Sequence, residues 1–156
     1  MVAGGLLLAS CPAFAVSGGG KDYAEQTIKF QDFSGKVYTG KDFSGADAVG
    51  TNFKGSTMRG ARFFKSDLAK ADFSKADISG ASFEGANLEG TILTDTIAEG
   101  TAFSQTLVDV ADISGTDFTD AIMRSDIQKN LCKRPDAKGT NPKTQVDTRD
   151  SLFCQD

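Results

Sequence analysis

Residues 66–90 read SDLAK ADFSK ADISG ASFEG ANLEG, and this stretch decides the fold because it repeats a five-residue pattern. The same register runs through 19 consecutive pentads, residues 31–125, without an insertion or a deletion. Neither the period of two of a strand nor the 3.6-residue period of a helix produces such a pattern. A chain that repeats a short unit many times in a fixed register is expected to stack its units as a solenoid.

Each of the five positions of the pentad has its own chemistry. Position one is Ala, Ser or Thr in all sixteen pentads from Ala46 to Ala121, and position three is apolar throughout residues 31–125. Position five holds 11 of the 17 glycines. We therefore predict that positions one and three face the interior. Glycine at position five then supplies the corner that turns the chain after each unit.

The order of the large apolar residues predicts four pentads in each coil. If residues 20 apart stack, Phe33, Phe53 and Phe73 form one interior ladder, and Phe43, Phe63, Phe83 and Phe103 form another on the opposite wall. Large residues then face each other across one axis, which fills a square cross-section efficiently. This predicts an all-β solenoid of about five coils. The other two walls carry Tyr38, Met58, Ile78, Ala98 and Phe118, and Ala48, Leu68, Leu88 and Val108.

The units ADFSK, ADISG, ASFEG and ANLEG resemble the consensus of the pentapeptide-repeat family. The resemblance implies a right-handed quadrilateral β-helix. Some positions depart from the consensus, and the two lysines among them lead us to expect an irregular first coil. The departures are Lys36 and Lys41 at position one, and Asp95, Gln105, Val110 and Asp120 at position five.

The N-terminal residues indicate an export or thylakoid-transfer signal. Residues 1–15 contain an apolar run followed by Ala13-Phe14-Ala15, a small-x-small cleavage pattern, and the run is too short to span a bilayer. A second interpretation is a bacterial lipoprotein signal that ends at Cys11. We assign residues 16–30 to a linker and an N-terminal helical cap, because Asp22 and Glu25 have the spacing of a capping box. No membrane span is expected in the mature chain.

A second helical cap is predicted for residues 126–156. Ser125 and Gln128 repeat the capping-box spacing, the helix should end before Pro135, and residues 148–154 suit a second short helix or turn. Export would leave two cysteines, Cys132 and Cys154, and an even pair in an exported chain suggests a disulfide. Such a bond would stabilise the cap by roughly 3 kcal/mol on the loop-entropy model.

The export signal, the repeats and the tail LCKRPDAKGTNPKTQVDTRDSLFC together resemble the thylakoid lumenal pentapeptide-repeat proteins, in particular their 15 kDa type. This resemblance implies a chloroplast protein of the thylakoid lumen. A bacterial periplasmic location, as for a lipoprotein of the same fold, is the alternative. The expected partners are unidentified lumenal proteins, and the expected oligomeric state is a monomer or a weak dimer.

The composition argues against catalysis and against nucleic-acid binding. The chain has no His, and we find no catalytic residues, no metal ligands and no cofactor motif. Residues 26–75 carry nine Lys and Arg against five Asp and Glu, whereas residues 76–125 carry one against nine. The rod is thus polar along its axis rather than uniformly acidic, unlike the DNA-mimicking inhibitors of gyrase in this family. A gyrase-type inhibitor remains the alternative function.

The favoured function is a protein-interaction or structural module. Its possible partner surface lies on the basic N-terminal coils, where an aromatic residue accompanies the cations. The residues of this surface are Lys54, Arg59, Arg62, Phe64, Lys65, Lys70 and Lys75.

Overall fold

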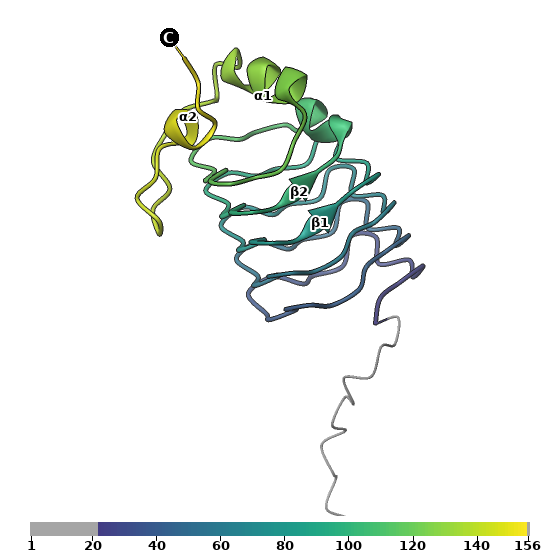
Figure 1. Cartoon of the computed structure of the whole chain (residues 1–156). Coiled ribbons are helices and arrows are strands. Elements are labelled where there is room, and N and C mark those ends of the chain that lie inside the picture. Colours follow the sequence, from purple (N-terminus) through teal and green to yellow (C-terminus); the bar gives the residue numbers. More distant parts are fainter. Residues whose placement is uncertain (1–21, 156) are drawn as a thin grey trace, which may run out of the picture.

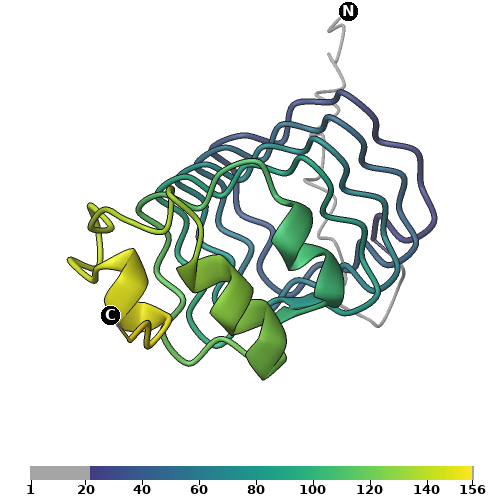
Figure 2. The same cartoon turned by 90° about the horizontal axis from the view of Figure 1, so that it is seen from above.

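The computed structural model describes residues 22–155, in which residues 22–124 form a solenoid that is covered at one end by helices (Figure 1). Parallel β-bridges join residues 20 apart, for example Asp32 with Asn52 and Asn52 with Asp72. One coil therefore contains four pentads, as predicted, and the solenoid has about five coils. Seen from above, the coils lie over one another (Figure 2). We name the four walls A, B, C and D after the pentads 51–55, 56–60, 61–65 and 66–70.

Backbone hydrogen bonds between successive coils hold this stack together. The amide of Phe33 donates to the carbonyl of Asn52 (2.7 Å), that of Gly35 donates to Lys54 (2.9 Å), and that of Asn52 donates back to Gln31 (2.9 Å). The corner after each pentad interrupts the ladder, so regular strands are very short. In the described chain they are β1 (Ser82–Phe83) and β2 (Ala102–Phe103), which pair in parallel on wall C.

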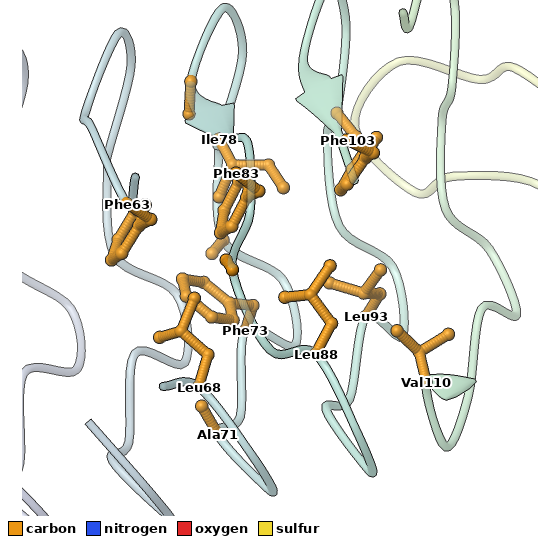
Figure 3. Packing of buried hydrophobic residues seen from close by; sticks show 14 of the residues in the cluster. Phe63, Leu68, Ala71, Phe73, Ile78, Phe83, Leu88, Leu93, Phe103 and Val110 are labelled. Atoms are coloured by element: carbon orange, nitrogen blue, oxygen red, sulfur yellow. The ribbon is translucent and has the colours of Figure 1, made fainter. Parts of the chain in front are cut away.

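The predicted phenylalanine ladders form the core (Figure 3). Phe43, Phe63 and Phe83 stack with ring centroids 4.9 and 4.8 Å apart, and Phe53 stacks on Phe73 at 4.7 Å. Rings of opposite walls meet edge to face, as Phe53 and Phe63 do at 5.9 Å. Both arrangements are favourable for aromatic quadrupoles. The large residue at position three therefore packs within its wall and across the coil.

Hydroxyl groups at position one also satisfy the buried backbone. The Oγ1 atoms of Thr51, Thr91 and Thr96 are buried and donate to carbonyl oxygens of the preceding coil at 2.8–2.9 Å. A buried hydroxyl without a partner would destabilise the fold. Threonine at this position therefore adds a hydrogen bond between coils that alanine cannot make.

The regular register breaks at residues 105–110, where the structure corrects our prediction. Gln105–Asp109 form a 3-10 helix, η1, in which Leu107 is buried while Val108 is only partly buried. Val110 is turned inward with φ −66° instead of forming a left-handed corner. A β-branched residue is rarely found at positive φ, so valine cannot take the corner position. Regular pairing resumes at Asp112, which is bridged to Ile92.

The predicted N-terminal helical cap is wrong in the described part of its range. Residues 22–30 continue the repeat, as the last four residues of one pentad and the full pentad 26–30. Glu25 takes a left-handed corner (φ 59°), Ile28 is buried, and the Tyr23 ring stacks on Phe43 at 4.7 Å. The spacing of Asp22 and Glu25 matches the repeat as well as it matches a capping box, and the pentad form places Tyr23 and Ile28 against the next coil, where their apolar surface is removed from water. Residues 16–21 and the predicted signal, residues 1–15, lie outside the described residues.

The first coil is also regular, contrary to expectation. Its amides pair with the second coil in the same pattern as later coils. Lys36 is exposed, and Lys41 Nζ contacts Asp22 Oδ1 at 3.2 Å. At the end of the stack, a long side chain at position one can reach solvent without disturbing the backbone.

The C-terminal end carries two helices, α1 (Ser125–Cys132) and α2 (Thr148–Ser151) (Figure 1). The α1 helix ends before Pro135 as predicted, but its capping box does not form, because Gln128 Nε2 donates to the carbonyl of Leu152 (2.5 Å). The side chain of Asp147 caps α2 instead, accepting from the amide of Arg149. The chain between the helices is fixed by buried Asn141, whose Nδ2 contacts the carbonyl oxygens of Asp95, Thr96 and Gly115.

Two alanine substitutions distinguish the observed register at η1 from the regular one. Leu107→Ala should destabilise the protein by about 2–5 kcal/mol, because it leaves a cavity in the core. Val108→Ala should cost about 1 kcal/mol or less, since Val108 is partly exposed. Urea unfolding followed by circular dichroism measures both values. A larger effect at Val108 than at Leu107 would show that the pentad is regular after all.

Candidate interaction surface

The seven residues predicted as a partner surface do not form one patch. The 20-residue coil places Lys54 and Lys75 on wall A, Arg59 on wall B, and Lys70 on wall D. The remaining three residues, Arg62, Phe64 and Lys65, lie together on wall C. The cations therefore encircle the rod as a belt, and no single flat partner can contact all of them.

Two members of this belt are already engaged within the protein. Arg59 Nε lies 2.6 Å from Asp77 Oδ2, which belongs to the next coil of the same wall. The backbone carbonyl of Lys75 accepts from Lys143 Nζ at 3.5 Å, so the C-terminal segment lies next to this corner. The Arg59 guanidinium is thus paired within the protein, whereas at Lys75 only the backbone carbonyl is engaged and the residue stays exposed.

The three residues on wall C form a compact basic and aromatic cluster, which we call the wall C patch. Phe64 is 44% exposed, although it occupies a position that is mostly polar or small in other pentads. Lys65 Nζ lies 5.1 Å from the centroid of the Phe64 ring, a cation–π distance. In the described chain, no ion pair involves Arg62 or Lys65. This cluster is the part of the predicted surface in which a ring and two cations share one wall.

The regular Asp and Asn at position two have a structural role that the sequence reasoning missed. Their Oδ1 atom accepts a hydrogen bond from the amide two residues later, as Asp72 does from Ser74 (2.8 Å) and Asp117 does from Thr119 (2.9 Å). Asn52 makes the same bond to Lys54 (3.0 Å). This is an Asx turn, which suits Asp and Asn. The recurring Asp-x-Ser and Asp-x-Thr spacing was the available signal.

Several of these carboxyl groups have a lowered pKa. For Asp77 and Asp112 burial raises the pKa, but several interactions together outweigh it and hold the pKa below the usual range. Ser79 and Arg59 donate hydrogen bonds to Asp77, and Ser114 and Thr94 donate hydrogen bonds to Asp112. The pKa of Asp136 is lowered chiefly by its hydrogen bond from Arg134. A lowered pKa means that folding favours the charged form. These carboxylates therefore stabilise the fold, which is a sufficient reason for their presence.

No group of three or more metal-ligating side chains is found in residues 22–155. The same residues include no helix that is long and apolar enough to cross a membrane. The predicted cysteine pair, in contrast, is joined: Cys132 and Cys154 form a disulfide with their Cα atoms 5.5 Å apart. This bond ties the end of α1 to the segment that follows α2.

The coils, the buried position-three residues and the Asx turns define a solenoid of pentapeptide repeats. The family model described as Pentapeptide repeats matches this chain in 8 copies, over residues 32–64, 42–73, 58–95 and 71–107. The chain is 36% identical to a solved pentapeptide repeat protein from the thylakoid lumen of Arabidopsis thaliana, with a TM-score of 0.79. That match covers 92% of this chain and 99% of the other. This chain belongs to the pentapeptide-repeat family.

One more distant structure shares the fold. The pentapeptide repeat protein Rfr23 from the cyanobacterium Cyanothece 51142 is 15% identical, with a TM-score of 0.51, and the match covers 62% of this chain and 76% of that one. The plasmid-mediated fluoroquinolone resistance protein QnrB1 is 20% identical over 64% of this chain and 75% of its own. Its TM-score of 0.28 is too low to inform function. No curated protein matched the sequence.

Removal of the disulfide should destabilise the protein by roughly 3 kcal/mol, because the bond closes a loop of 22 residues in the unfolded chain. The comparison is urea unfolding of the oxidised protein against the Cys132→Ser/Cys154→Ser variant. As a matched control, the free energy of unfolding of Cys132→Ser/Cys154→Ser should agree closely with that of the reduced wild type. An unchanged unfolding midpoint would show that the bond does not stabilise the fold.

Asp77, Asp112 and Asp136 should make no pH-dependent contribution to stability above about pH 5, and stability should fall as the pH drops below about 4, through their lowered pKa values. The sign follows because these carboxyl groups bind protons more weakly in the folded state than in the unfolded state. Asn keeps the Asx turn without the charge, as Asn52 shows. Asp77→Asn/Asp112→Asn should therefore reduce the loss between pH 5 and pH 3, measured by thermal unfolding. An equal loss in this variant would assign the acid sensitivity to other groups.

Proposed function

We propose that this chain is a non-enzymatic pentapeptide-repeat protein of the thylakoid lumen that acts as a protein-interaction or structural module. The observation that carries the proposal is its 36% identity, over 92% of the chain, to a plant protein of that compartment. The family relationship also supports the right-handed quadrilateral form of the β-helix. A monomer or weak dimer with unidentified lumenal partners fits this proposal.

The surface supports binding better than catalysis. The acidic side chains at position two are largely engaged in Asx turns, and the interior of the coils is filled by stacked rings and aliphatic side chains. The wall C patch instead offers two cations beside an exposed aromatic ring, a composition common in protein interfaces. We propose that a lumenal partner contacts this patch.

Fractionation with in situ cross-linking and mass spectrometry on isolated thylakoids tests both the location and the existence of a partner. The chain should be recovered in the lumenal fraction, cross-linked to other lumenal proteins through Lys65 or a neighbouring lysine. Recovery in the stroma or the cytosol would contradict the proposed location. The alternatives, a gyrase-type inhibitor or a periplasmic lipoprotein, would then have to be tested, and the latter depends on Cys11, outside the described residues.

Charge reversal tests the wall C patch directly. Arg62→Glu/Lys65→Glu should weaken capture of the lumenal partner about tenfold, since it replaces two attractive contacts by repulsive ones. The matched control is Lys36→Glu/Lys54→Glu, which makes the same change in net charge on walls B and A. Capture is measured by quantitative pull-down from lumenal extract. Equal capture by the two double variants would remove the patch from the proposal.

A further inference from the structure

The C-terminal cap contains an exposed groove that the wall C patch does not reach. The groove has a volume of about 610 Å³ and lies between α1 and the segment after α2. The disulfide forms part of its wall, which fixes its two sides relative to each other. Its lining residues are Gln128, Lys129, Cys132, Lys133, Phe153, Cys154 and Gln155.

Phe153 projects an apolar ring at this groove. It is 73% exposed, and its backbone has a left-handed φ of 53°. At the corners of the solenoid the repeat requires such a conformation, but Phe153 lies outside the repeats. A bulky residue at positive φ is uncommon and unfavourable. A large exposed aromatic ring on a rigid support has the form of an interface anchor, because little entropy is lost when it becomes buried.

The charge at the groove is one-sided among the residues that line it. Lys129 and Lys133 lie one helical turn apart, and in residues 22–155 no ion pair involves either of them. No carboxylate is among the lining residues. Asp150, on α2, is exposed but does not line the groove.

The acidic residues of the cap are mostly engaged elsewhere. Asp126 pairs with Arg124 at 2.9 Å, Asp136 pairs with Arg134 at 2.7 Å, and Asp147 caps α2. Within residues 22–155 the two lysines therefore make no ion pair, and they lie beside an apolar ring. The groove is complementary to a chain that carries negative charge next to a hydrophobic side chain.

We propose that this groove is a docking site for an acidic peptide segment of a partner protein, with an aromatic or large aliphatic residue packed against Phe153. The lysines receive the carboxylates of the segment, and the disulfide keeps the groove preorganised. This site lies at the capped end of the rod and is separate from the wall C patch, so each can fail without the other.

Selection from a random peptide library tests the proposal while the partner protein is still unidentified. Random dodecapeptides are selected for binding to the oxidised full chain, and the affinity of the enriched peptides is measured by fluorescence anisotropy. The enriched peptides should be net negative and should contain an aromatic or large aliphatic residue. Lack of enrichment, or enrichment of basic or purely polar peptides, would overturn the proposal.

Variants locate the binding. Lys129→Glu/Lys133→Glu should weaken binding of the selected peptides at least tenfold. Phe153→Gly should also weaken peptide binding at least tenfold. Glycine adopts the left-handed backbone at this position without strain, so a loss of binding in this variant does not report unfolding. Lys36→Glu/Lys54→Glu and Arg62→Glu/Lys65→Glu should leave the affinity within about twofold of wild type.

If the control variants lose as much peptide affinity as Lys129→Glu/Lys133→Glu does, the attraction is nonspecific electrostatics and the assigned site is overturned. Sedimentation of the chain alone provides a further check. Self-association that Phe153→Gly abolishes would identify the occupant as a second copy of the chain and overturn the peptide assignment.

Discussion

The left-handed corner at every fifth residue is the constraint on which the rest of this structure depends. It turns the chain by one wall, stacks residues that are 20 apart, and leaves room for only one large inward side chain per pentad. Glycine adopts this corner without strain, and residues such as Lys65 and Asp95 adopt it at a small cost. Valine does not, and at Val110 the corner is lost and a 3-10 helix precedes it. Two successive corners, at Gln105 and Val110, are therefore absent, while the coils on either side remain regular.

The same constraint decides what kind of function the rod can have. Its interior is filled by rings stacked at 4.7–4.9 Å, and its walls are built from turns that use the acidic side chains for their own hydrogen bonds. Neighbours on a wall are 20 residues apart, so residues that are close in the sequence, such as Lys54 and Arg59, point from different walls. A cluster on such a rod must come from one pentad or from pentads 20 residues apart, as Arg62, Phe64 and Lys65 do.

The pentad register was enough to predict the four-sided coil, the inward residues and the Phe43–Phe63–Phe83 ladder, because one packing rule repeats along the chain. The even number of cysteines left after export was enough to predict the Cys132–Cys154 pair at the C-terminal end. The failures occur where a local pattern has two solutions. Asp22 and Glu25 fit a helix cap and a pentad equally well, and stacking against Phe43 decides in favour of the pentad. For the candidate site, the seven residues were chosen by residue type alone. The predicted 20-residue coil already implied that they lie on different walls, and the structure places only Arg62, Phe64 and Lys65 together.

The departures from the repeat are more informative about binding than the repeat itself. A pentad position that carries Asp, Asn, Thr or Ser has the same structural role in every coil, so it cannot distinguish one partner from another. Phe64 occupies an outward position where the fold gains nothing from a ring, and Phe153 holds an exposed ring on an unfavourable backbone beside a disulfide. Neither is required by the solenoid, because the core is complete without them. Recognition on a uniform scaffold must depend on such exceptions, and here they lie at two separate places along the rod. In this proposal the regular coils are a rigid spacer that sets the distance between the two proposed binding sites.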